Sequence, residues 1–412
     1  MATPAFEASP APPTLVLGGG VAGLLCAWHL RRRGIPVEVW EAAAAPGGWV
    51  RTQAWEGGQA EWGPQGLPLR AGDATDRLLR ALGLSFAEVP RLPRWAALDG
   101  RLVPVPAHGG AFLVSPLLSL PGRLRLLAGL AWPVRARDDE SLATWTRRRF
   151  GTEVAERLLP LAARGLFATA AEELDAAILT RRAGARQVRL PGGMGSLPRA
   201  LARDLELRPG LRARRLEPVP GGWRVSGDGH EALAARVILA LPAFEAAELL
   251  APHAPEAGAA LREIPYVSVE NWHSIHAAVR PLASGHGFLV HPREGSDLLG
   301  CTVAHPGVDG ARMHLRSFLP LGARPWSAVD AALRRWVPEL PEAQAILRLE
   351  APRALAAPPP GQRHRLARIL GALPPGLDWV AAARFGQGLG ALIAGVEALV
   401  TQGAESRIGG WP

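Results

Sequence analysis

The most constraining feature of this sequence is a glycine-rich stretch close to its start. Residues 14–17 form an apolar strand pattern, residues 18–23 fit G-x-G-x-x-G, and residues 24–33 predict an apolar helix with a basic end. In such a unit the first glycine permits a tight turn, the second lets the backbone approach a pyrophosphate, and the third lets the helix pack on the sheet. The predicted phosphate-binding turn comprises Gly18, Gly19, Gly20, Val21, Ala22 and Gly23.

A second predicted strand follows this helix and strengthens the interpretation. Residues 35–40 supply the strand, and Glu41 stands at its end, where a carboxylate can accept hydrogen bonds from both hydroxyls of an adenosine ribose. A lone G-x-G-x-x-G is weak evidence, because glycine turns between strands and helices are common. Here strand, turn, helix, second strand and acidic residue occur in order, which predicts an α/β dinucleotide-binding domain.

Arginine alone carries the positive charge of the chain. There are 46 basic residues and none of them is lysine, and the formal net charge is +9. The dense runs at 31–33 and 147–149 lie in predicted helices without interleaved aromatic residues, so they are interpreted as solvated helix faces and not as a nucleic-acid site. Without lysine, the chain cannot form a Schiff base, and it cannot place a lysine-held water beside a redox cofactor, as many amine oxidases do.

Cysteine and histidine spacing predicts no metal site. Cys26 and Cys301 are far apart in the sequence, and His273 with His276 is interpreted as an exposed pair on a strand. Because disulfides are not needed, a reducing cytoplasm is the expected compartment. The first 13 residues have neither the basic nor the apolar region of a signal peptide. No Ser/His/Asp or Cys/His arrangement can be recognised, so no catalytic side chain is assigned.

One apolar segment, from residue 102 to residue 122, contains no acidic or arginine side chain. A helix of this length could cross a bilayer. Its prolines and its Gly109-Gly110 pair argue against a continuous helix. The segment is therefore interpreted as an apolar wall of a substrate cavity, or as a lip that rests on a membrane.

The remaining patterns predict two discontinuous domains in a chain of 412 residues. A mostly helical insertion is expected at 84–190, sheet at 265–279 and 287–318, and a strand, glycine-rich loop and helix at 377–400. The expected nucleotide-binding domain comprises residues 1–83, 190–262 and 365–412. The expected substrate domain comprises residues 84–189 and 263–364.

Several motifs, in order along the chain, carry a resemblance to a known family. Glu41, the Gly47-Gly48 pair and Thr52 form the second signature of a flavoprotein group that includes amine oxidases, phytoene desaturases and protoporphyrinogen oxidases. Within this group the chain most resembles the protoporphyrinogen/coproporphyrinogen oxidases. The matching motifs are P-G-G-W-V-R at 46–51, E-W-G-P-Q-G at 61–66, L-V-P-V-P at 102–106, D-E-S at 139–141, R-R-F-G-T-E-V at 148–154, G-L-F-A at 165–168 and G-G-M at 192–194.

The resemblance implies FAD as the cofactor. It also implies an α/β fold in which a Rossmann-like FAD-binding domain carries an inserted α+β substrate domain. By this resemblance, the glycine turn would hold the pyrophosphate of FAD, Glu41 would bind its ribose, and the backbone of Arg215 would meet its adenine. Core packing is the alternative role for Trp49, and a surface position is the alternative for Arg51. The further cofactor-binding residues implied are Gly48, Trp49, Arg51, Gly63, Pro64, Gln65, Gly66, Arg215, Gly388, Leu389 and Gly390.

The family reaction implies an oxygen-dependent oxidation of a porphyrinogen to a porphyrin, a step of heme biosynthesis. The flavin is the catalyst, and the protein supplies orientation, a dry cavity and countercharge for the carboxylates of an apolar, acidic substrate. Arg94, Arg101 and Arg123 flank the apolar segment and are expected to meet propionates.

Two departures from the family pattern leave alternatives open. The connection from Asp175 to Gly192 is tens of residues shorter than in the family, and the C-terminal pattern G-V-x-x-x-D-C-I is altered after Gly388. A shortened member with a reduced helical cap and, at most, peripheral membrane contact is therefore expected. The alternatives are another FAD oxidoreductase on an apolar substrate, such as a desaturase or amine oxidase, and a flavin-binding accessory protein without turnover.

Overall fold

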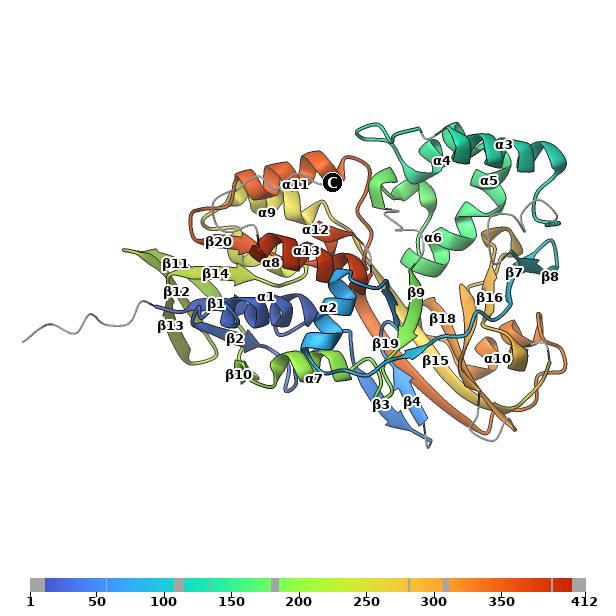
Figure 1. Ribbon diagram of the computed structural model, residues 1–412, viewed down its shortest axis with the longest axis horizontal. Coiled ribbons are helices and arrows are strands. Elements are labelled where there is room, and N and C mark those ends of the chain that lie inside the picture. Colours follow the sequence, from blue (N-terminus) through green and yellow to red (C-terminus); the bar gives the residue numbers. More distant parts are fainter. Residues whose placement is uncertain are drawn as a thin grey trace, which may run out of the picture.

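The computed structural model describes residues 12–56, 58–106, 115–132, 134–178, 185–280, 282–306, 311–386 and 388–401. A five-stranded parallel sheet forms one end of the molecule, and a seven-stranded mixed sheet forms the other (Figure 1). The parallel sheet has the strand order β10-β2-β1-β14-β20. Its strands are β1 (Thr14–Leu17), β2 (Val37–Glu41), β10 (Glu206–Pro209), β14 (Arg236–Leu239) and β20 (Leu377–Trp379).

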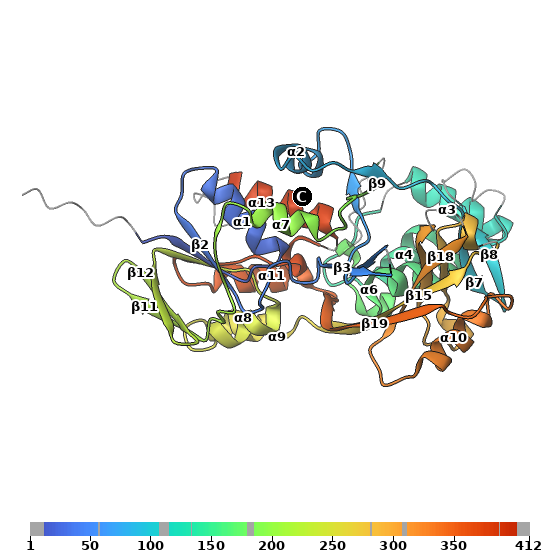
Figure 2. The ribbon, with the colours of Figure 1, turned by 90° about the horizontal axis from the view of Figure 1, so that it is seen from below.

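Helices cover both faces of the parallel sheet, and β1 shows why. Alternate side chains of a strand point to opposite faces. Leu15 and Leu17 accordingly pack with α8, α9 and α11, whereas Val16 packs with α1, α2, α7 and α13. Figure 2 shows the two groups on opposite sides of the sheet. The helices are α1 (Val21–Arg31), α2 (Ala74–Ala81), α7 (Ser196–Ala202), α8 (Ala243–Leu250), α9 (Pro255–Arg262), α11 (Gln362–Gly371) and α13 (Leu389–Thr401).

Three small sheets accompany this end of the molecule. The antiparallel sheet β11-β12-β13 lies at its outer edge (Figure 1), β3 and β4 form a hairpin, and β5-β9-β6 lies on the side of the second sheet. Their bounds are β3 (Thr52–Trp55), β4 (Gly58–Glu61), β5 (Leu67–Leu69), β6 (Ala87–Glu88), β9 (Arg186–Arg189), β11 (Arg215–Val219), β12 (Gly222–Gly227) and β13 (His230–Ala234).

The second sheet has the order β19-β15-β18-β17-β16-β7-β8. Helix α10 (Trp326–Arg334) packs on it, with Val329 and Leu333 in the same apolar core as Trp272 and Leu315. The strands are β7 (Arg94–Leu98), β8 (Arg101–Val105), β15 (Tyr266–Ala277), β16 (Gly287–Val290), β17 (Gly300–Pro306), β18 (Arg312–Pro320) and β19 (Ala345–Ala356).

A helical cap stands beside the second sheet (Figure 1). Ser141 accepts a hydrogen bond from the Thr144 N–H and so caps α4, and Gly151, with φ +91, separates α4 from α5. The cap helices are α3 (Leu120–Ala131), α4 (Leu142–Phe150), α5 (Thr152–Arg157) and α6 (Leu159–Phe167). Outside the cap, the short helix α12 (Ala382–Phe385) precedes α13.

The prediction of a mostly helical insertion at 84–190 was wrong for its first part. Strands β7 and β8 lie there, and β7 pairs in parallel with β16, with Arg94 opposite Gly287. Strand β19 was not predicted at all. Strands depend on partners that are distant in the sequence, so a local pattern does not identify all of them. Residues 107–114 of the apolar segment lie outside the described residues.

Candidate functional site

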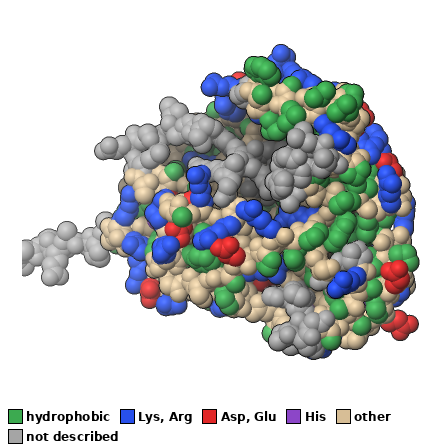
Figure 3. Space-filling view, turned by 45° about the vertical axis from the view of Figure 1, so that its right-hand side comes forward, with side chains coloured by type: hydrophobic (Ala, Val, Ile, Leu, Met, Phe, Trp, Pro, Cys, Tyr) green, Lys and Arg blue, Asp and Glu red, His purple; other side chains and the backbone are tan. Residues whose placement is uncertain are grey.

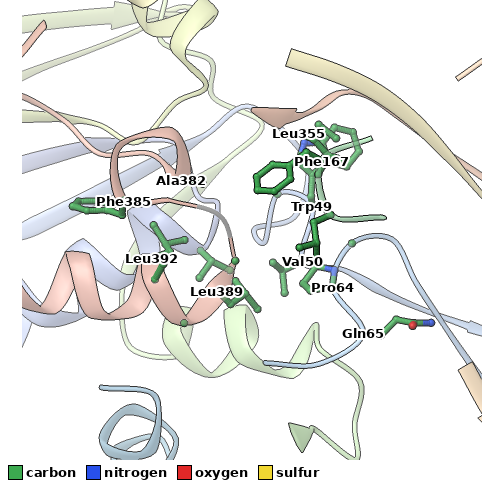
Figure 4. A pocket seen from close by; sticks show the side chains of 18 of the residues that line it. Trp49, Val50, Pro64, Gln65, Phe167, Leu355, Ala382, Phe385, Leu389 and Leu392 are labelled. Carbon is green, nitrogen blue, oxygen red and sulfur yellow. The ribbon is translucent and has the colours of Figure 1, made fainter. Parts of the chain in front are cut away.

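A single continuous cavity of about 3640 Å³ runs from the glycine turn at 18–23 to the seven-stranded sheet. Figure 3 shows a hollow in the surface with arginine side chains beside it. Figure 4 shows the two walls at the middle of the cavity, with Leu389 and Leu392 on one side and Trp49, Val50 and Pro64 on the other. The cavity is therefore long enough to hold a dinucleotide and a second molecule beyond it.

The glycine turn fits a phosphate group. Gly18 has φ +107, and a Cβ atom there would lie 2.5 Å from the Ala240 carbonyl oxygen; a Cβ on Gly23 would lie 2.0 Å from the Gly18 carbonyl oxygen. A Cβ on Gly20, which lines the cavity, would meet nothing within 4 Å. The first and third glycines are therefore required by packing. The second faces open space at the N-terminus of α1, where backbone N–H groups and the helix dipole favour an anion.

Glu41 is held at the carboxyl end of β2 by its own neighbours. Its Oε2 accepts the Gly19 N–H at 2.7 Å and its Oε1 accepts the Ala43 N–H at 2.7 Å. Each carboxylate oxygen has further acceptor capacity, and the residue lines the cavity. The carboxylate is thus fixed in the cavity wall with acceptor capacity to spare.

The second glycine pair packs against the first turn. Gly47 donates its N–H to the Gly19 carbonyl oxygen at 2.8 Å, and Gly48 has φ +57. A Cβ on Gly63 would lie 2.4 Å from the Trp49 carbonyl oxygen, so the turn at 63–66 rests directly on Trp49. The rings of Trp49 and Trp62 stack with their centroids 6.4 Å apart. Segments that are separate in the sequence therefore form one wall.

The start of α13 closes the opposite wall. Gly388 has φ +98, and a Cβ on Gly390 would lie 2.7 Å from the Cγ of Pro68. Both glycines and Leu389 line the cavity. The first N–H groups of this helix are available to an anionic or carbonyl oxygen of a ligand.

Four of the predicted residues do not line the cavity. Gly19 and Gly23 stabilise the turn instead: Gly19 donates its N–H to Glu41, and Gly23 packs against the Gly18 carbonyl oxygen. The guanidinium of Arg51 lies over the Trp62 ring at 4.3 Å. Arg215 points to solvent and pairs with Glu217 at 2.9 Å. The cavity is lined directly before this position, by Ala213 and Arg214 among others, which precede the start of β11 at Arg215.

The sheet end of the cavity contains polar side chains that the sequence analysis missed. Asn271 donates to the Trp62 carbonyl oxygen at 3.1 Å and accepts from the Nε of Arg316 at 3.0 Å. Thr302 donates to the Oε1 of Gln65 at 3.1 Å. The available signal was an arginine in the middle of the apolar pattern of β18, M-H-L-R-S-F-L.

Burial lowers the pKa of several basic side chains at this end of the cavity. It lowers the pKa of Arg189 and of Arg164, and it lowers the pKa of Arg316 to about 10. Burial, followed by the charges of Arg94 and Arg189, lowers the pKa of His286 to about 4. The arginines concentrate positive charge in a partly dry site, which suits an anionic ligand, whereas His286 is neutral at neutral pH.

The two histidines predicted as an exposed pair are buried. His273 Nδ1 lies 2.8 Å from the Nε2 of His314, whereas His276 Nδ1 lies 2.8 Å from the Pro341 carbonyl oxygen. Among the described residues no group of three or more His, Cys, Asp or Glu side chains is placed to hold a metal ion. None of the described helices combines the length and apolar character needed to cross a membrane.

Comparisons with known proteins agree with this geometry. Residues 21–275 match the family described as flavin containing amine oxidoreductase. The human protoporphyrinogen oxidase is 30% identical over 376 residues, which cover 77% of this chain and 79% of the human one. The coproporphyrinogen III oxidase of Bacillus subtilis (strain 168) is 26% identical over 178 residues, covering 39% of this chain and 38% of that protein.

Solved structures share the fold. A proposed protoporphyrinogen oxidase from Exiguobacterium sp. 255-15 superimposes with a TM-score of 0.77 at 21% identity, over 96% of this chain and 98% of that one. A triple mutant of putrescine oxidase gives a TM-score of 0.76 at 18% identity, over 95% and 99% of the two chains. At these identities the likeness concerns the arrangement of the elements.

Proposed function

The chain belongs to the flavin-containing amine oxidoreductase family, where it groups with the protoporphyrinogen oxidases, and is an FAD-dependent oxidoreductase; from this premise we propose that it oxidises a porphyrinogen to a porphyrin with oxygen as acceptor. The predicted family, cofactor and fold class are thereby confirmed. The observation that supports the substrate is the combination of apolar walls and excess arginine at the sheet end of the cavity.

Charge at this end is strongly unbalanced. Two acidic residues line the cavity near this end in the described part of the chain: Glu88, which pairs with Arg186, and Asp73, which follows the strand paired with Arg186. The arginines that line this end are Arg91, Arg94, Arg164, Arg186, Arg189 and Arg316. A macrocycle that carries propionates offers apolar area to the walls and carboxylates to the guanidinium groups. A cationic amine would meet repulsion instead, and the absence of lysine also argues against an amine oxidase.

The expected propionate contacts need one revision. Arg94 lines the cavity, but Arg101 and Arg123 do not. Arg123 instead donates to the carbonyl oxygens of Leu118 at 3.0 Å and Ser115 at 2.7 Å, within the cap. Arg164 and Arg189 replace them as candidates, because both line the cavity. Each is held in place by a hydrogen bond to a backbone carbonyl oxygen, that of Ser296 for Arg164 and that of Ala304 for Arg189.

The chain's own residues position and enclose the substrate. FAD, when bound, would supply the two-electron acceptor. Trp49, Phe167 and Leu355 line the middle of the cavity and hold the macrocycle by apolar contact. Arg94, Arg164 and Arg189 orient it through its carboxylates, and the cap helix α6 limits the access of water.

The proposal is tested by adding a porphyrinogen to the FAD-loaded protein and following porphyrin fluorescence and peroxide with and without oxygen. We expect an oxygen-dependent rise above the autoxidation blank, and no such rise with the flavin-free apo-protein. Arg164→Gln should raise KM more for coproporphyrinogen, which carries more propionates, than for protoporphyrinogen. If the FAD-loaded protein never exceeds the blank, the substrate assignment fails and another oxidation or an accessory role replaces it.

We also propose peripheral contact of the cap with an anionic membrane surface, through helix α3. Leu120, Leu124, Leu127 and Leu130 follow one stripe of this helix and are 66%, 60%, 40% and 53% exposed, and Trp132 at its end is 73% exposed. An exposed apolar stripe on a positively charged protein is typical of a helix that lies in the lipid interface.

Vesicle co-sedimentation tests this contact. Replacing Leu124 and Leu127 together by glutamate should reduce the bound fraction on anionic vesicles at least about fivefold, since each buried leucine contributes about 1.5–3 kcal/mol. Leu233→Glu is the matched control, because Leu233 is 52% exposed on β13, in the other domain. Equal binding of the variant and the control would exclude α3 as the contact.

A further inference from the structure

Arg316 brings a guanidinium group to the cavity from the middle of the seven-stranded sheet. It lies on β18, in register with Thr302 of β17 on one side and His273 of β15 on the other. Its Nε donates to the Oδ1 of Asn271 at 3.0 Å, and its Nη2 lies 3.5 Å from the Trp62 carbonyl oxygen. Asn271 donates to the same carbonyl oxygen at 3.1 Å. The guanidinium is thus fixed beside the turn at 63–66.

The charge of Arg316 has no close counterion in the described part of the chain. Its pKa of about 10 keeps it positively charged at neutral pH, and Glu61 is the acid whose field acts on it, without an ion pair. Elsewhere the chain neutralises a buried charge directly, since Glu270 meets Arg324 at 2.8 Å and Arg348 at 2.5 Å. An enclosed charge without a partner is costly, so Arg316 is explained only by an anion that the cavity receives.

The location of Arg316 identifies that anion. The carbonyl group that it contacts belongs to Trp62, which directly precedes the turn at 63–66 and stacks with Trp49. The family resemblance implies that this turn and Trp49 hold the flavin end of FAD. A flavin that gains two electrons and one proton carries one net negative charge, so an anion appears beside this turn in every catalytic cycle.

We propose that Arg316, held in place by Asn271, is the countercharge for the reduced flavin of FAD. A cation fixed in an environment of low dielectric stabilises a nearby negative charge without having to reorganise. Its presence therefore raises the midpoint potential of the bound flavin and strengthens the binding of anions to the flavin. The inference rests on FAD binding and does not depend on the porphyrinogen substrate.

Sulfite and redox titrations of the FAD-loaded protein test this role without any organic substrate. Sulfite adds to the oxidised flavin and leaves a negative charge on it, which bleaches the visible flavin band and yields a dissociation constant. Arg316→Gln should weaken sulfite binding at least about tenfold and lower the midpoint potential by about 30 mV, the equivalent of tenfold for a two-electron couple. Arg316→Lys should restore most of both values, because it keeps the charge.

Two further variants make the result decisive. Arg312→Gln is the matched control, since Arg312 is exposed on the same strand outside the cavity and should leave both values unchanged. Asn271→Asp places a carboxylate against Arg316 with little change in shape. It should also weaken sulfite binding. If the Arg316 variants do not fold or do not retain FAD, the sulfite affinity of Asn271→Asp tests the proposal instead.

The proposal is overturned if Arg316→Gln keeps the sulfite affinity and the midpoint potential of the wild type. If the Arg316 variants do not fold or do not retain FAD, the same result in Asn271→Asp overturns it. A raised porphyrinogen KM combined with unchanged sulfite binding would also overturn it and would assign Arg316 to a substrate carboxylate. If the protein binds FAD and shows these shifts but does not oxidise a porphyrinogen, the countercharge stands while the proposed substrate fails.

Discussion

The two ends of the cavity are built in opposite ways. The nucleotide end uses backbone turns at 18–23 and 47–50 and one carboxylate, Glu41. The sheet end uses side chains such as Arg316 and Thr302, which the sheet register brings together from separate strands. A site formed by backbone N–H groups requires glycine at the positions where a Cβ atom would clash. A site formed by side chains depends on their charge and on the strand register, and substituting one of these residues leaves the backbone turns unchanged.

The largest expected effect concerns the nucleotide end. Gly23→Ala should abolish FAD binding, because the new Cβ would lie 2.0 Å from the Gly18 carbonyl oxygen and would push α1 away from the turn. The ratio of flavin to protein after purification measures this loss. Gly20→Ala sharpens the comparison, since its Cβ would meet nothing within 4 Å. It should leave the melting temperature of the apo-protein unchanged and still weaken FAD. Full flavin occupancy in Gly23→Ala would refute the packing argument.

The second prediction concerns stability at the sheet end. Glu270→Ala should lower the free energy of unfolding by about 3–5 kcal/mol, because it leaves Arg324 and Arg348 without their shared partner. Urea denaturation of the FAD-loaded protein measures the change. Glu350→Ala is the control: Glu350 also pairs with Arg348, at 2.9 Å, but is 52% exposed, so its loss should cost less than about 1 kcal/mol. Equal costs for the two variants would contradict the role of burial.

Glu41→Ala is expected to have a smaller effect. Hydrogen bonds to a charged acceptor contribute about 1.5–3 kcal/mol, so the dissociation constant of FAD should rise at least about tenfold. The Gly19 and Ala43 N–H groups also lose their acceptor. Titration of the apo-protein with FAD measures the constant, and Glu41→Gln, which keeps one acceptor oxygen, should lose less. An unchanged constant would show that the ribose is held elsewhere.

The smallest effect is a pH dependence at the sheet end. Burial and the charges of Arg94 on β7 and Arg189 on β9 lower the pKa of His286 from 6.5 to about 4. Between these values the unfolded chain binds a proton that the folded chain does not, so the stability due to this group is complete above pH 6.5 and is lost as the pH falls towards 4.

His286→Gln should therefore lose less stability than the wild type over this pH range. The difference should be about 1 kcal/mol after allowance for the partial exposure of the ring. Melting temperatures measured from neutral to acidic pH test this, with His364→Gln on the surface as the control. Identical acid sensitivity of His286→Gln and the wild type would show that the two arginines do not act on this ring.

Much of the nucleotide end could be predicted from the sequence. The turn at 18–23 and Glu41 depend on local geometry, where a missing Cβ or a strand end determines the conformation. The start of β11 illustrates the limit. The backbone of Arg215 was predicted to meet adenine, but the cavity is lined by residues 211–214, which come directly before the strand. Where β11 begins depends on its pairing with β12, and a local pattern does not specify it.

The sequence by itself determined the cofactor class, the family and the residues of the glycine turns, because these features are local and impose backbone conformations that only glycine tolerates. Only the tertiary structure decided what lies at the sheet end. It pairs β7 with β16, buries His273, and brings Arg316 and Asn271 to the Trp62 carbonyl group. Contacts between residues so far apart in the chain arise from strand pairing and the desolvation of charge, which leave no periodic signal in the sequence.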